Sequence, residues 1–422
     1  MTSQAKYPDH PILEEGYKAE LTVRIGRELL KGPCDFACLV RGAEGAYPSD
    51  VLAVLRQLET AGEACVTSAG DWKRCGLLNA ASQRTPEEAE PEGTARTCLP
   101  EPHPLDFDWR FSESTLAALQ RRMDVSQDEA VAILGAPTLY KHLVDSGVDA
   151  WLFDKNAQII EHLRDAGYTS VTQGDLFEFT AAPRRFHCVV ADPPWYIEHY
   201  RAFLEAGHSM LLPDGRILMS VLPRLTRPSA SSDRFHVLEI AARFGFDLIE
   251  VSPGALHYES PPFEVEALRA EGLALGAWRN GDLFTFAMCS RPPQIEEPRT
   301  KPVAERWDSI PFGQTTVKIK VEHSSSREPF DYKAASSTGS LRLRSVSRRS
   351  PVRSRINFWT SRNVALTITK PQMVAELLRK VAGGGVASEA VAVIAYEYQL
   401  SDKEIDRLRQ LIELLDSEAS LR

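Results

Sequence analysis

The chain has 422 residues, of which 25% are charged and 43% hydrophobic, and its formal net charge is −9. That length predicts two or three domains, each with a core of its own. No run approaches the roughly 18 consecutive apolar residues of a membrane span, and Met1–Lys6 lacks the basic and apolar parts of a signal sequence, so we expect a cytoplasmic protein without membrane association. Seven cysteines without metal-ligand spacing predict scattered reduced thiols and no metal site.

Residues 1–80 are predicted to form a winged-helix-like domain. Helical spacing and turn residues predict helices over 19–31, 36–41 and 48–61, followed by short strands over 63–66 and 71–73. The third helix places its apolar side chains on one face and leaves Arg56 and Gln57 outward. Such a module either reads DNA through that helix or serves as a protein-contact or dimerisation unit, and a single basic residue there leaves both interpretations open.

Residues 81–123 are predicted to be a linker followed by a lead-in helix. Pro, Glu and Thr are frequent over 84–103, and helical spacing returns over 106–123. Because the glutamates of the linker repel phosphate, we expect any polyanion to bind elsewhere on the chain.

Short apolar strands alternate with helical stretches through residues 124–295, as a doubly wound α/β sheet requires. Seven strands are predicted, over 131–135, 150–153, 169–171, 186–191, 216–222, 246–251 and 283–288. The helical pattern is clearest over 157–166 and 197–207. The predicted fold class is therefore α/β, with a Rossmann-like seven-stranded domain between the winged-helix-like domain and a basic and helical C-terminal region. In such a sheet, ligands bind outside the carboxyl ends of the strands.

Two of these strand ends carry acidic residues suited to a nucleoside cofactor. Asp154 follows the second strand, where a carboxylate can accept hydrogen bonds from two ribose hydroxyls, although it can also be the N-cap of the next helix. Asp175 can accept from the amino group of an adenine ring that Leu176 or Phe177 covers, or it can be an ordinary turn residue.

The first strand ends in a loop with one glycine, Gly135, where dinucleotide-binding loops have two or three. Gly135 permits close backbone approach, and Pro137 is a suitable first residue of a helix. A cofactor without a pyrophosphate needs less room at this loop. The loop therefore favours S-adenosylmethionine over a dinucleotide.

The fourth strand runs directly into Asp192-Pro193-Pro194-Trp195. The amino nitrogen of a purine is a poor nucleophile because its lone pair is drawn into the ring. The Asp192 carboxylate and the Pro193 carbonyl can accept both amino protons and favour the pyramidal nitrogen of the transition state. The two prolines stiffen the loop, and Trp195 offers a flat surface for a base. The alternative interpretation is a rigid turn after a strand.

The loop between the last two predicted strands carries further aromatic residues. Tyr258 and Phe263 are candidates for a clamp around a flipped base, which must leave the stack before its amino group can react. A packed loop without such a role is the alternative.

Residues 296–362 are predicted to be a basic, partly disordered segment. Between Asp331 and Glu376 there is no acidic residue, and the nine basic ones give this stretch a charge of +9 against −18 for the remainder. The arginines expected to contact the phosphates of DNA or RNA are Arg348, Arg349, Arg353 and Arg355. Phe358 and Trp359 are expected to stack on unpaired bases. The alternative is a disordered basic linker with no fixed partner.

Residues 363–422 are predicted to form a helical region. A strand over 363–369 precedes helices over 371–381, 387–398 and 401–418. The last helix has an apolar face that we interpret as a packing or dimer surface, and the oligomeric state stays open.

The stretch from about Val131 to Met288 resembles class I S-adenosylmethionine-dependent methyltransferases with an Asp-Pro-Pro-aromatic motif. Within that family, the tetrapeptide Asp192–Trp195 is similar to the motif that binds the target amine in N6-adenine methyltransferases. The resemblance implies that Asp192–Trp195 hold the amino group of an adenine. It also implies that Gly135, Asp154 and Asp175 contact the cofactor.

The loop Gly135-Ala136-Pro137-Thr138-Leu139-Tyr140 resembles the Ser-(Ser/Thr)-Pro-(Ser/Thr)-Leu-Tyr loop of elongation-factor lysine methyltransferases, which also carry Asp-Pro-Pro-aromatic. This second resemblance implies a protein lysine as the methyl acceptor. Under that interpretation Trp195, Tyr196 and Tyr258 are candidates for an aromatic cage around the lysine side chain.

The leading hypothesis is therefore an S-adenosylmethionine-dependent methyltransferase that modifies the N6 amino group of adenine in DNA or RNA. One alternative is a protein lysine N-methyltransferase. The other is a non-catalytic nucleic-acid-binding regulator with a degenerate cofactor site.

Overall fold

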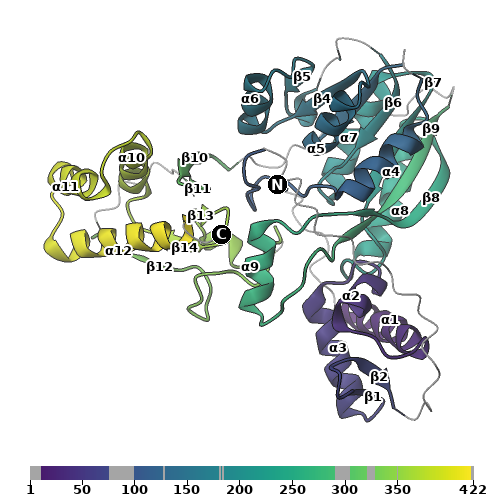
Figure 1. Ribbon diagram of the computed structural model, residues 1–422, viewed down its shortest axis with the longest axis horizontal. Helices are drawn as coiled ribbons and strands as arrows, with labels where there is room; N and C mark the ends of the chain where they lie inside the picture. Colours follow the sequence, from purple (N-terminus) through teal and green to yellow (C-terminus); the bar gives the residue numbers. More distant parts are fainter. Residues whose placement is uncertain are drawn as a thin grey trace. The chain divides into compact units, whose positions relative to one another are not determined.

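The structure is a computed structural model that describes residues 11–75, 99–126, 129–179, 182, 185–289, 305–320, 328–348 and 350–419. The chain divides into two compact units, whose elements are labelled in Figure 1. The first unit comprises Met1–Pro100, Arg110–Glu259 and Ala277–Lys301, and the second comprises Glu101–Trp109, Ser260–Gly276 and Pro302–Arg422. Within the described ranges, no helix combines the length and apolar character needed to cross a membrane.

The N-terminal part of the first unit holds three helices and an antiparallel hairpin. Its elements are α1 (Pro11–Leu30), α2 (Phe36–Gly42), α3 (Pro48–Thr60), β1 (Ala64–Val66) and β2 (Trp72–Arg74). Val51 and Leu55 on α3 are buried, whereas Arg56 and Gln57 are exposed, as the helical spacing predicts. The three helices and the hairpin are thus confirmed, and their assignment as a winged helix stays a prediction.

The first unit also contains a seven-stranded sheet, which confirms the predicted Rossmann-like α/β fold. Its strands are β3 (Val131–Leu134), β4 (Ala150–Asp154), β5 (Val171–Gln173), β6 (Phe186–Ala191), β7 (Leu211–Val221), β8 (Phe246–His257) and β9 (Asn280–Met288), in the spatial order β5-β4-β3-β6-β7-β9-β8. Strands β3 to β7 run parallel, and β9 pairs antiparallel with both β7 and β8. All four residues of β3 are buried, which is typical of a parallel strand that is covered on both faces.

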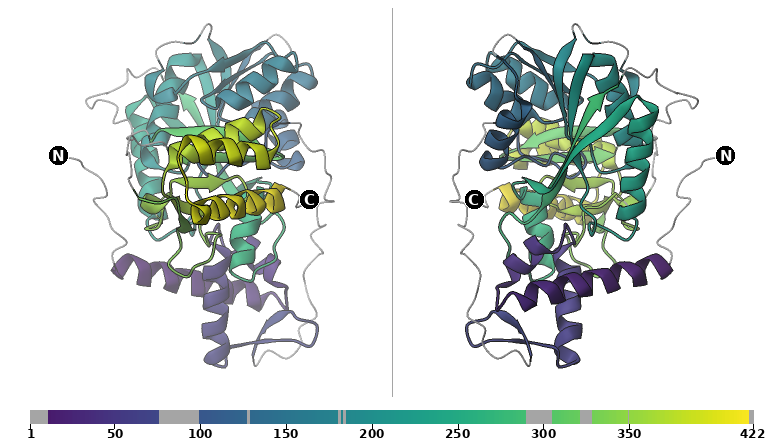
Figure 2. Two further views of the ribbon diagram at one scale, coloured as in Figure 1. Left: turned by 90° about the vertical axis from the view of Figure 1, so that its left-hand side faces the viewer. Right: turned by 90° about the vertical axis from the view of Figure 1, so that its right-hand side faces the viewer.

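Five helices pack on this sheet (Figure 2). They are α4 (Glu113–Met123), α5 (Pro137–Asp145), α6 (Ala157–Asp165), α7 (Ile197–Met210) and α8 (Ala230–Arg243). Helices α5 and α7 begin directly after the loops that follow β3 and β6, so the N-terminus of each lies at the carboxyl edge of the sheet. The predicted lead-in helix and the helices over 157–166 and 197–207 are confirmed.

The second unit is built on a five-stranded antiparallel sheet with the order β10-β11-β13-β14-β12. Its elements are α9 (Pro262–Ala270), β10 (Trp307–Phe312), β11 (Thr315–Lys320), β12 (Tyr332–Ala334), β13 (Phe358–Thr360), β14 (Ala365–Ile368), α10 (Pro371–Ala382), α11 (Ala387–Glu397) and α12 (Asp402–Ala419). The three C-terminal helices, yellow in Figure 2, lie beside these strands and share one apolar core with them. The predicted C-terminal strand and helices are confirmed.

The segment over 296–362, predicted to be basic and partly disordered, contributes strands to this sheet in its described part. The described part of that range contributes β10, β11, β12 and β13, and their inward residues include Val317 and Ile319, which are fully buried. The boundary predicted after residue 362 falls inside the sheet, because β13 pairs with β14 across it. These strands are only three to six residues long, and the stretch between β12 and β13 is rich in arginine and serine, so no long alternating pattern marked them in the sequence.

Candidate active site

The carboxyl edge of the seven-stranded sheet collects the predicted cofactor and substrate residues. Backbone hydrogen bonds continue past the strand ends: Gly135 N donates to Phe153 O (3.1 Å), Asp192 N to Leu134 O (3.0 Å), and Gly174 N to Asp154 O (2.9 Å). The parallel pairing of β3 with β4 and β6, and of β4 with β5, therefore places Gly135, Asp154, Asp175 and Asp192 at one edge.

Gly135 allows the first loop to approach the Asp-Pro-Pro-Trp loop closely. Its φ is +71°, and an added Cβ would lie 3.3 Å from the carbonyl oxygen of Asp192 and 3.4 Å from the ring of Phe203. Any larger residue would strain the backbone and press on both neighbours. Pro137 is at the start of α5 and is buried, as its position in the sequence predicts.

Asp154 ends β4, and its Oδ1 accepts from the backbone N–H of Asn156 at 2.7 Å. The N-cap of α6 is Asn156, whose Oδ1 accepts from Gln158 N at 3.1 Å and Ile159 N at 3.4 Å. The alternative in which Asp154 caps this helix is therefore wrong. Asp154 instead fixes the turn between β4 and α6 and remains half-buried at the sheet edge.

Asp175 begins the short 3₁₀ helix η1 (Leu176–Glu178), and its carboxylate accepts from Phe177 N at 3.1 Å. It thus has the turn role that the sequence offered as an alternative, and it is half-buried at the same edge as Asp154. Leu176 is buried, while the ring of Phe177 meets His199 edge-on with centroids 5.1 Å apart.

Asp192 is held by a chain of buried hydrogen bonds that the sequence did not reveal. Tyr258 donates from its hydroxyl to Asp192 Oδ1 at 2.8 Å, and Ser220 Oγ lies 2.7 Å from the same hydroxyl. Trp195 Nε1 donates to Ser220 Oγ at 3.1 Å. The indole is 8% exposed, and the guanidinium of Arg279 lies 4.3 Å from the ring centroid. Trp195 therefore presents no open face for a stacked base in this structure, and its predicted stacking role stays a prediction.

The backbone after the motif is also tied down. Tyr196 precedes α7, and the guanidinium of Arg227 lies 5.5 Å from the centroid of its ring. Arg227 donates to the carbonyl oxygen of Trp195 at 2.6 Å and pairs with Asp233 at 2.8 Å. Arg227 follows β7, far from the motif in the sequence, and no local pattern marked it.

The two residues of the predicted aromatic clamp lie in different units. Tyr258 belongs to the first unit and Phe263, on α9, belongs to the second. Their side chains are 2% and 1% exposed, respectively, and Phe263 packs edge-on against Trp109 with centroids 5.8 Å apart. Neither ring offers an exposed face to a base, which agrees with the alternative of a packed loop.

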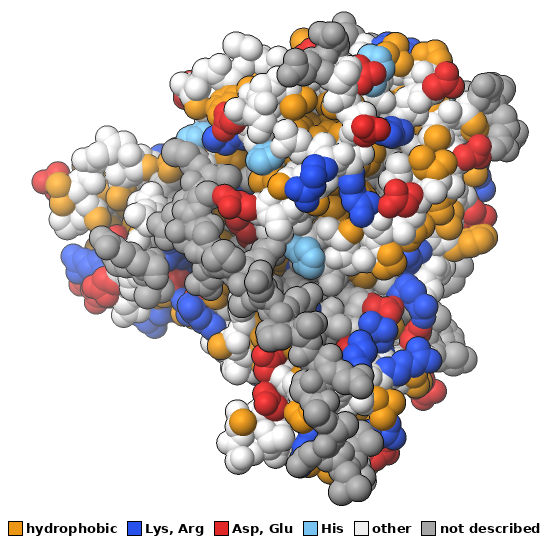
Figure 3. Space-filling model, turned by 45° about the vertical axis from the view of Figure 1, so that its right-hand side comes forward, with side chains coloured by type: hydrophobic (Ala, Val, Ile, Leu, Met, Phe, Trp, Pro, Cys, Tyr) orange, Lys and Arg blue, Asp and Glu red, His pale blue; other side chains and the backbone are white. Residues whose placement is uncertain are grey.

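The basic stretch is only partly available for phosphate. Arg342 pairs with Glu266 (2.7 Å), Arg362 with Glu101 (3.3 Å) and Lys370 with Glu404 (2.9 Å), so acidic residues from outside the stretch neutralise a third of its charge. Figure 3 shows a face on which blue and red side chains are interspersed. The stretch that is uniformly basic in the sequence is therefore not a uniformly positive surface in the fold.

The arginines predicted to contact nucleic acid differ in their surroundings. Arg355 is exposed and Arg348 half-buried, whereas Arg349 lies outside the described residues. The guanidinium of Arg353 lies 5.1 Å from the ring centroid of Trp359. The prediction that Phe358 and Trp359 stack on bases is wrong, because both lie in β13 with exposed fractions of 0% and 1%.

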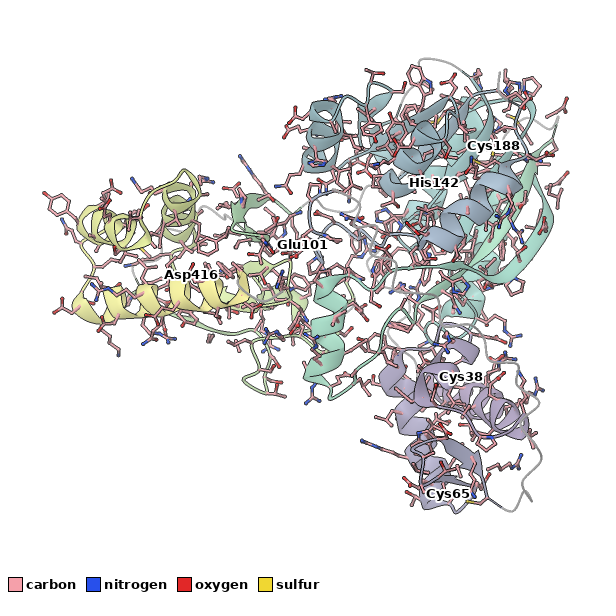
Figure 4. The ribbon with its side chains drawn as sticks, viewed as in Figure 1. Cys38, Cys65, Glu101, His142, Cys188 and Asp416 are labelled. Atoms are coloured by element: carbon pink, nitrogen blue, oxygen red, sulfur yellow. The ribbon has the colours of Figure 1, made fainter. Side chains whose placement is uncertain are left out.

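The thiols show no metal-binding arrangement in the part of the chain that the structure describes, where no group of three or more Cys, His, Asp or Glu side chains is placed to hold an ion. Cys38 and Cys65 lie in the N-terminal helices and hairpin, and Cys188 is buried in β6 (Figure 4).

The chain is similar to known methyltransferases in sequence and in fold. The family model described as "Probable N6-adenine methyltransferase" matches residues 108–245. Among solved structures, the chain is similar to a branched-chain polyamine synthase mutein from Thermus thermophilus, with a TM-score of 0.50 and 16% identity over 69% of this chain and 94% of the other. A glycopeptide N-methyltransferase bound to S-adenosylmethionine gives a TM-score of 0.31 and 17% identity over 43% and 95% of the two chains. None of the curated proteins matches the sequence.

The seven-stranded sheet and the helices that pack on it have the Rossmann-like fold of methyltransferases. Together with the family match, they identify the seven-stranded domain as that of an S-adenosylmethionine-dependent N-methyltransferase. Gly135 fits a close cofactor loop, because its φ of +71° and the 3.3 Å from an added Cβ to the carbonyl oxygen of Asp192 both favour glycine there.

Proposed function

We propose that this enzyme methylates the exocyclic N6 amino group of adenine in DNA or RNA. The observation that carries the proposal is the position of Asp192, whose carboxylate is fixed by Tyr258 at the end of β6 beside the Gly135 loop. The match to probable N6-adenine methyltransferases supports the same acceptor. A rigid acceptor beside a cofactor loop is what an amine with a poorly available lone pair needs.

The residues that would hold the cofactor are those at the edge of the sheet. We assign Gly135 and Pro137 to the backbone wall of its site, Asp154 to the ribose hydroxyls, and Asp175 with Leu176 to the adenine ring. S-adenosylmethionine supplies a methyl group on a positively charged sulfur. A nitrogen can attack the methyl carbon in line with the carbon–sulfur bond.

Asp192 and the Pro193 carbonyl would orient the acceptor. By accepting both amino protons, they turn the nitrogen lone pair away from the ring system and toward the methyl group. The proton on the product nitrogen can leave to water, so the site needs no strong base. The two prolines and the hydrogen bond from Arg227 to Trp195 keep these acceptors in place before substrate binds.

The N-terminal helices and the basic stretch would supply contacts to the nucleic acid. Replacing Arg348, Arg349, Arg353 and Arg355 with glutamine is expected to weaken binding to DNA or RNA. It should also make the affinity less dependent on salt. The slope of log affinity against log salt concentration should fall by about one for each arginine–phosphate contact that is lost. Fluorescence anisotropy at several salt concentrations measures both, and Arg56→Gln on α3 separates the contribution of the N-terminal module. An affinity that does not change with salt in the unmodified protein would contradict nucleic-acid binding.

A polyamine is the second candidate acceptor. The similar synthase, whose structure contains N4-aminopropylspermidine and 5′-methylthioadenosine, covers 69% of this chain, which is more than the seven-stranded domain. In an analogous reaction, a polyamine nitrogen would bond to the aminopropyl carbon of decarboxylated S-adenosylmethionine, the carbon–sulfur bond would break, and 5′-methylthioadenosine would leave as the nitrogen loses a proton. The charge of −18 outside the basic stretch suits a polycation.

One experiment separates these acceptors. The purified protein is incubated with a cell extract and S-adenosylmethionine that carries a labelled methyl group, and equal portions are then treated with nuclease or protease. We expect the label to be released by nuclease and to be recovered as N6-methyladenine after digestion to nucleosides. Label released by protease alone would overturn this proposal in favour of a protein lysine. If the protein turns over only decarboxylated S-adenosylmethionine with spermidine, the acceptor is a polyamine and this proposal is overturned.

A further inference from the structure

The hydrogen bonds behind Asp192 form a chain with a single direction. An indole N–H can only donate, so Ser220 Oγ accepts from Trp195 Nε1 at 3.1 Å. An ionised carboxylate can only accept, so the hydroxyl proton of Tyr258 points to Asp192 Oδ1 at 2.8 Å. Ser220 must then donate its own proton to the Tyr258 oxygen at 2.7 Å. Each proton in the chain points toward Asp192.

The chain is shielded from solvent, which makes its direction strict. Ser220 and Tyr258 are both buried, and Phe111 lies against the Tyr258 ring with centroids 4.9 Å apart. Burial first, and then the nearby Asp192 charge, raise the pKa of Tyr258 far above its usual range, so this hydroxyl stays a donor at any working pH. It can neither accept a proton from a substrate nor act as a base.

The rings of Trp195 and Tyr258, which belong to this hydrogen-bond chain, are tightly packed. A Cβ on Gly281 would lie 3.2 Å from the Trp195 ring and 3.3 Å from the Tyr258 ring, so β9 passes directly behind them. Arg279, two residues earlier, lies over the Trp195 ring. The motif tryptophan is thus anchored by its ring nitrogen, its ring face and, through Arg227, its carbonyl oxygen.

We propose that Tyr258 and Ser220 are positioning residues that hold the Asp192 carboxylate in the orientation used for amine transfer, with Trp195 as the anchor of the chain. The inference rests on the proposed function of Asp192. It differs from the interpretation of Tyr258 as part of a substrate clamp or cage, because Tyr258 acts through Asp192 and has no contact with the acceptor.

The test compares two variants that leave the shape of the site almost unchanged. Tyr258→Phe removes the hydroxyl that donates to Asp192, and we expect kcat to fall about tenfold with the Kd for S-adenosylmethionine unchanged. Ser220→Ala removes the donor behind it and should lower kcat about threefold. The matched control is Tyr168→Phe, which breaks a 2.8 Å tyrosine–aspartate hydrogen bond to Asp145, two residues without a role in the site, and it should leave kcat unchanged.

A double-mutant cycle distinguishes positioning from general stability. If Tyr258 acts through Asp192, Tyr258→Phe should have no further effect on the residual rate of Asp192→Ala. Equal losses in both backgrounds, or a Tyr258→Phe variant with unchanged kcat, would overturn the inference. Thermal unfolding is measured in parallel, and Ser220→Ala decides the matter if Tyr258→Phe fails to fold. Absence of transfer to any acceptor in the unmodified protein would instead count against the proposed function.

Discussion

Replacing Asp192 with alanine is expected to lower methyl transfer by at least about 100-fold, while the affinity for S-adenosylmethionine stays within about twofold of the unmodified protein. The reason is geometric. The carboxylate of Asp192 accepts from Tyr258 and its backbone N–H donates to Leu134 O at the end of β6, whereas Asp154 ends β4 and Asp175 follows β5. Removing it takes away an acceptor that acts on the transition state and leaves the cofactor residues in place.

The measurement is single-turnover transfer of a labelled methyl group, together with a calorimetric titration of the cofactor. Asp192→Asn is the informative companion, because the amide keeps the size and one acceptor but loses the negative charge. We expect it to retain more activity than Asp192→Ala and less than the unmodified enzyme. Unchanged turnover in both variants would remove Asp192 from the site.

Replacing Asp154 with alanine is expected to have the opposite effect, on cofactor binding rather than on chemistry. Loss of a charge-assisted hydrogen bond to ribose should weaken the binding of S-adenosylmethionine by about 1–3 kcal/mol, which raises its Kd about 5- to 150-fold. With saturating cofactor, the transfer rate should recover most of its original value.

The control for this variant is set by the hydrogen bond from Asn156 N to Asp154. Asn156→Ala removes the cap of α6 and disturbs the same turn, but it keeps the Asp154 carboxylate. It should therefore reduce stability by about 1 kcal/mol with a much smaller change in cofactor affinity. If the two variants weaken cofactor binding equally, the turn rather than the carboxylate is responsible. An unchanged Kd in Asp154→Ala would mean that the cofactor site lies elsewhere.

Most of the fold was predictable because its signals are local. The seven strands of the first unit are short apolar runs that overlap their predicted ranges, and the helices predicted over 157–166 and 197–207 correspond to α6 and α7. The parallel order then brings the strand ends to one edge, and Gly135, Asp154, Asp175 and Asp192 follow from that rule. The second unit was less predictable, since its strands are only three to six residues long and an arginine- and serine-rich stretch lies between β12 and β13.

The contacts that complete the site were not predictable from local patterns. Tyr258 lies 66 residues from Asp192 in the sequence and Ser220 lies 38 residues from Tyr258, and the pairing of β6, β7, β9 and β8 brings them together. Apart from their charge, nothing in the sequence marked Arg227 and Arg279 as neighbours of the Asp-Pro-Pro-Trp motif. The one available hint was Tyr258 itself, which the sequence singled out as an aromatic residue in a substrate loop while its burial and its bond to Asp192 stayed hidden.

The sequence by itself determined the α/β class, the strands whose ends carry the site, and the tetrapeptide at the end of the fourth strand, because each depends on residues that are neighbours in the chain. The tertiary structure decided which groups hold Asp192, that Phe358 and Trp359 are core residues, and that several basic residues are already neutralised by Glu101, Glu266 and Glu404. Hydrogen bonds, burial and ion pairs of this kind join residues that are distant in the sequence. They depend on how strands and helices pack, which no local periodicity encodes.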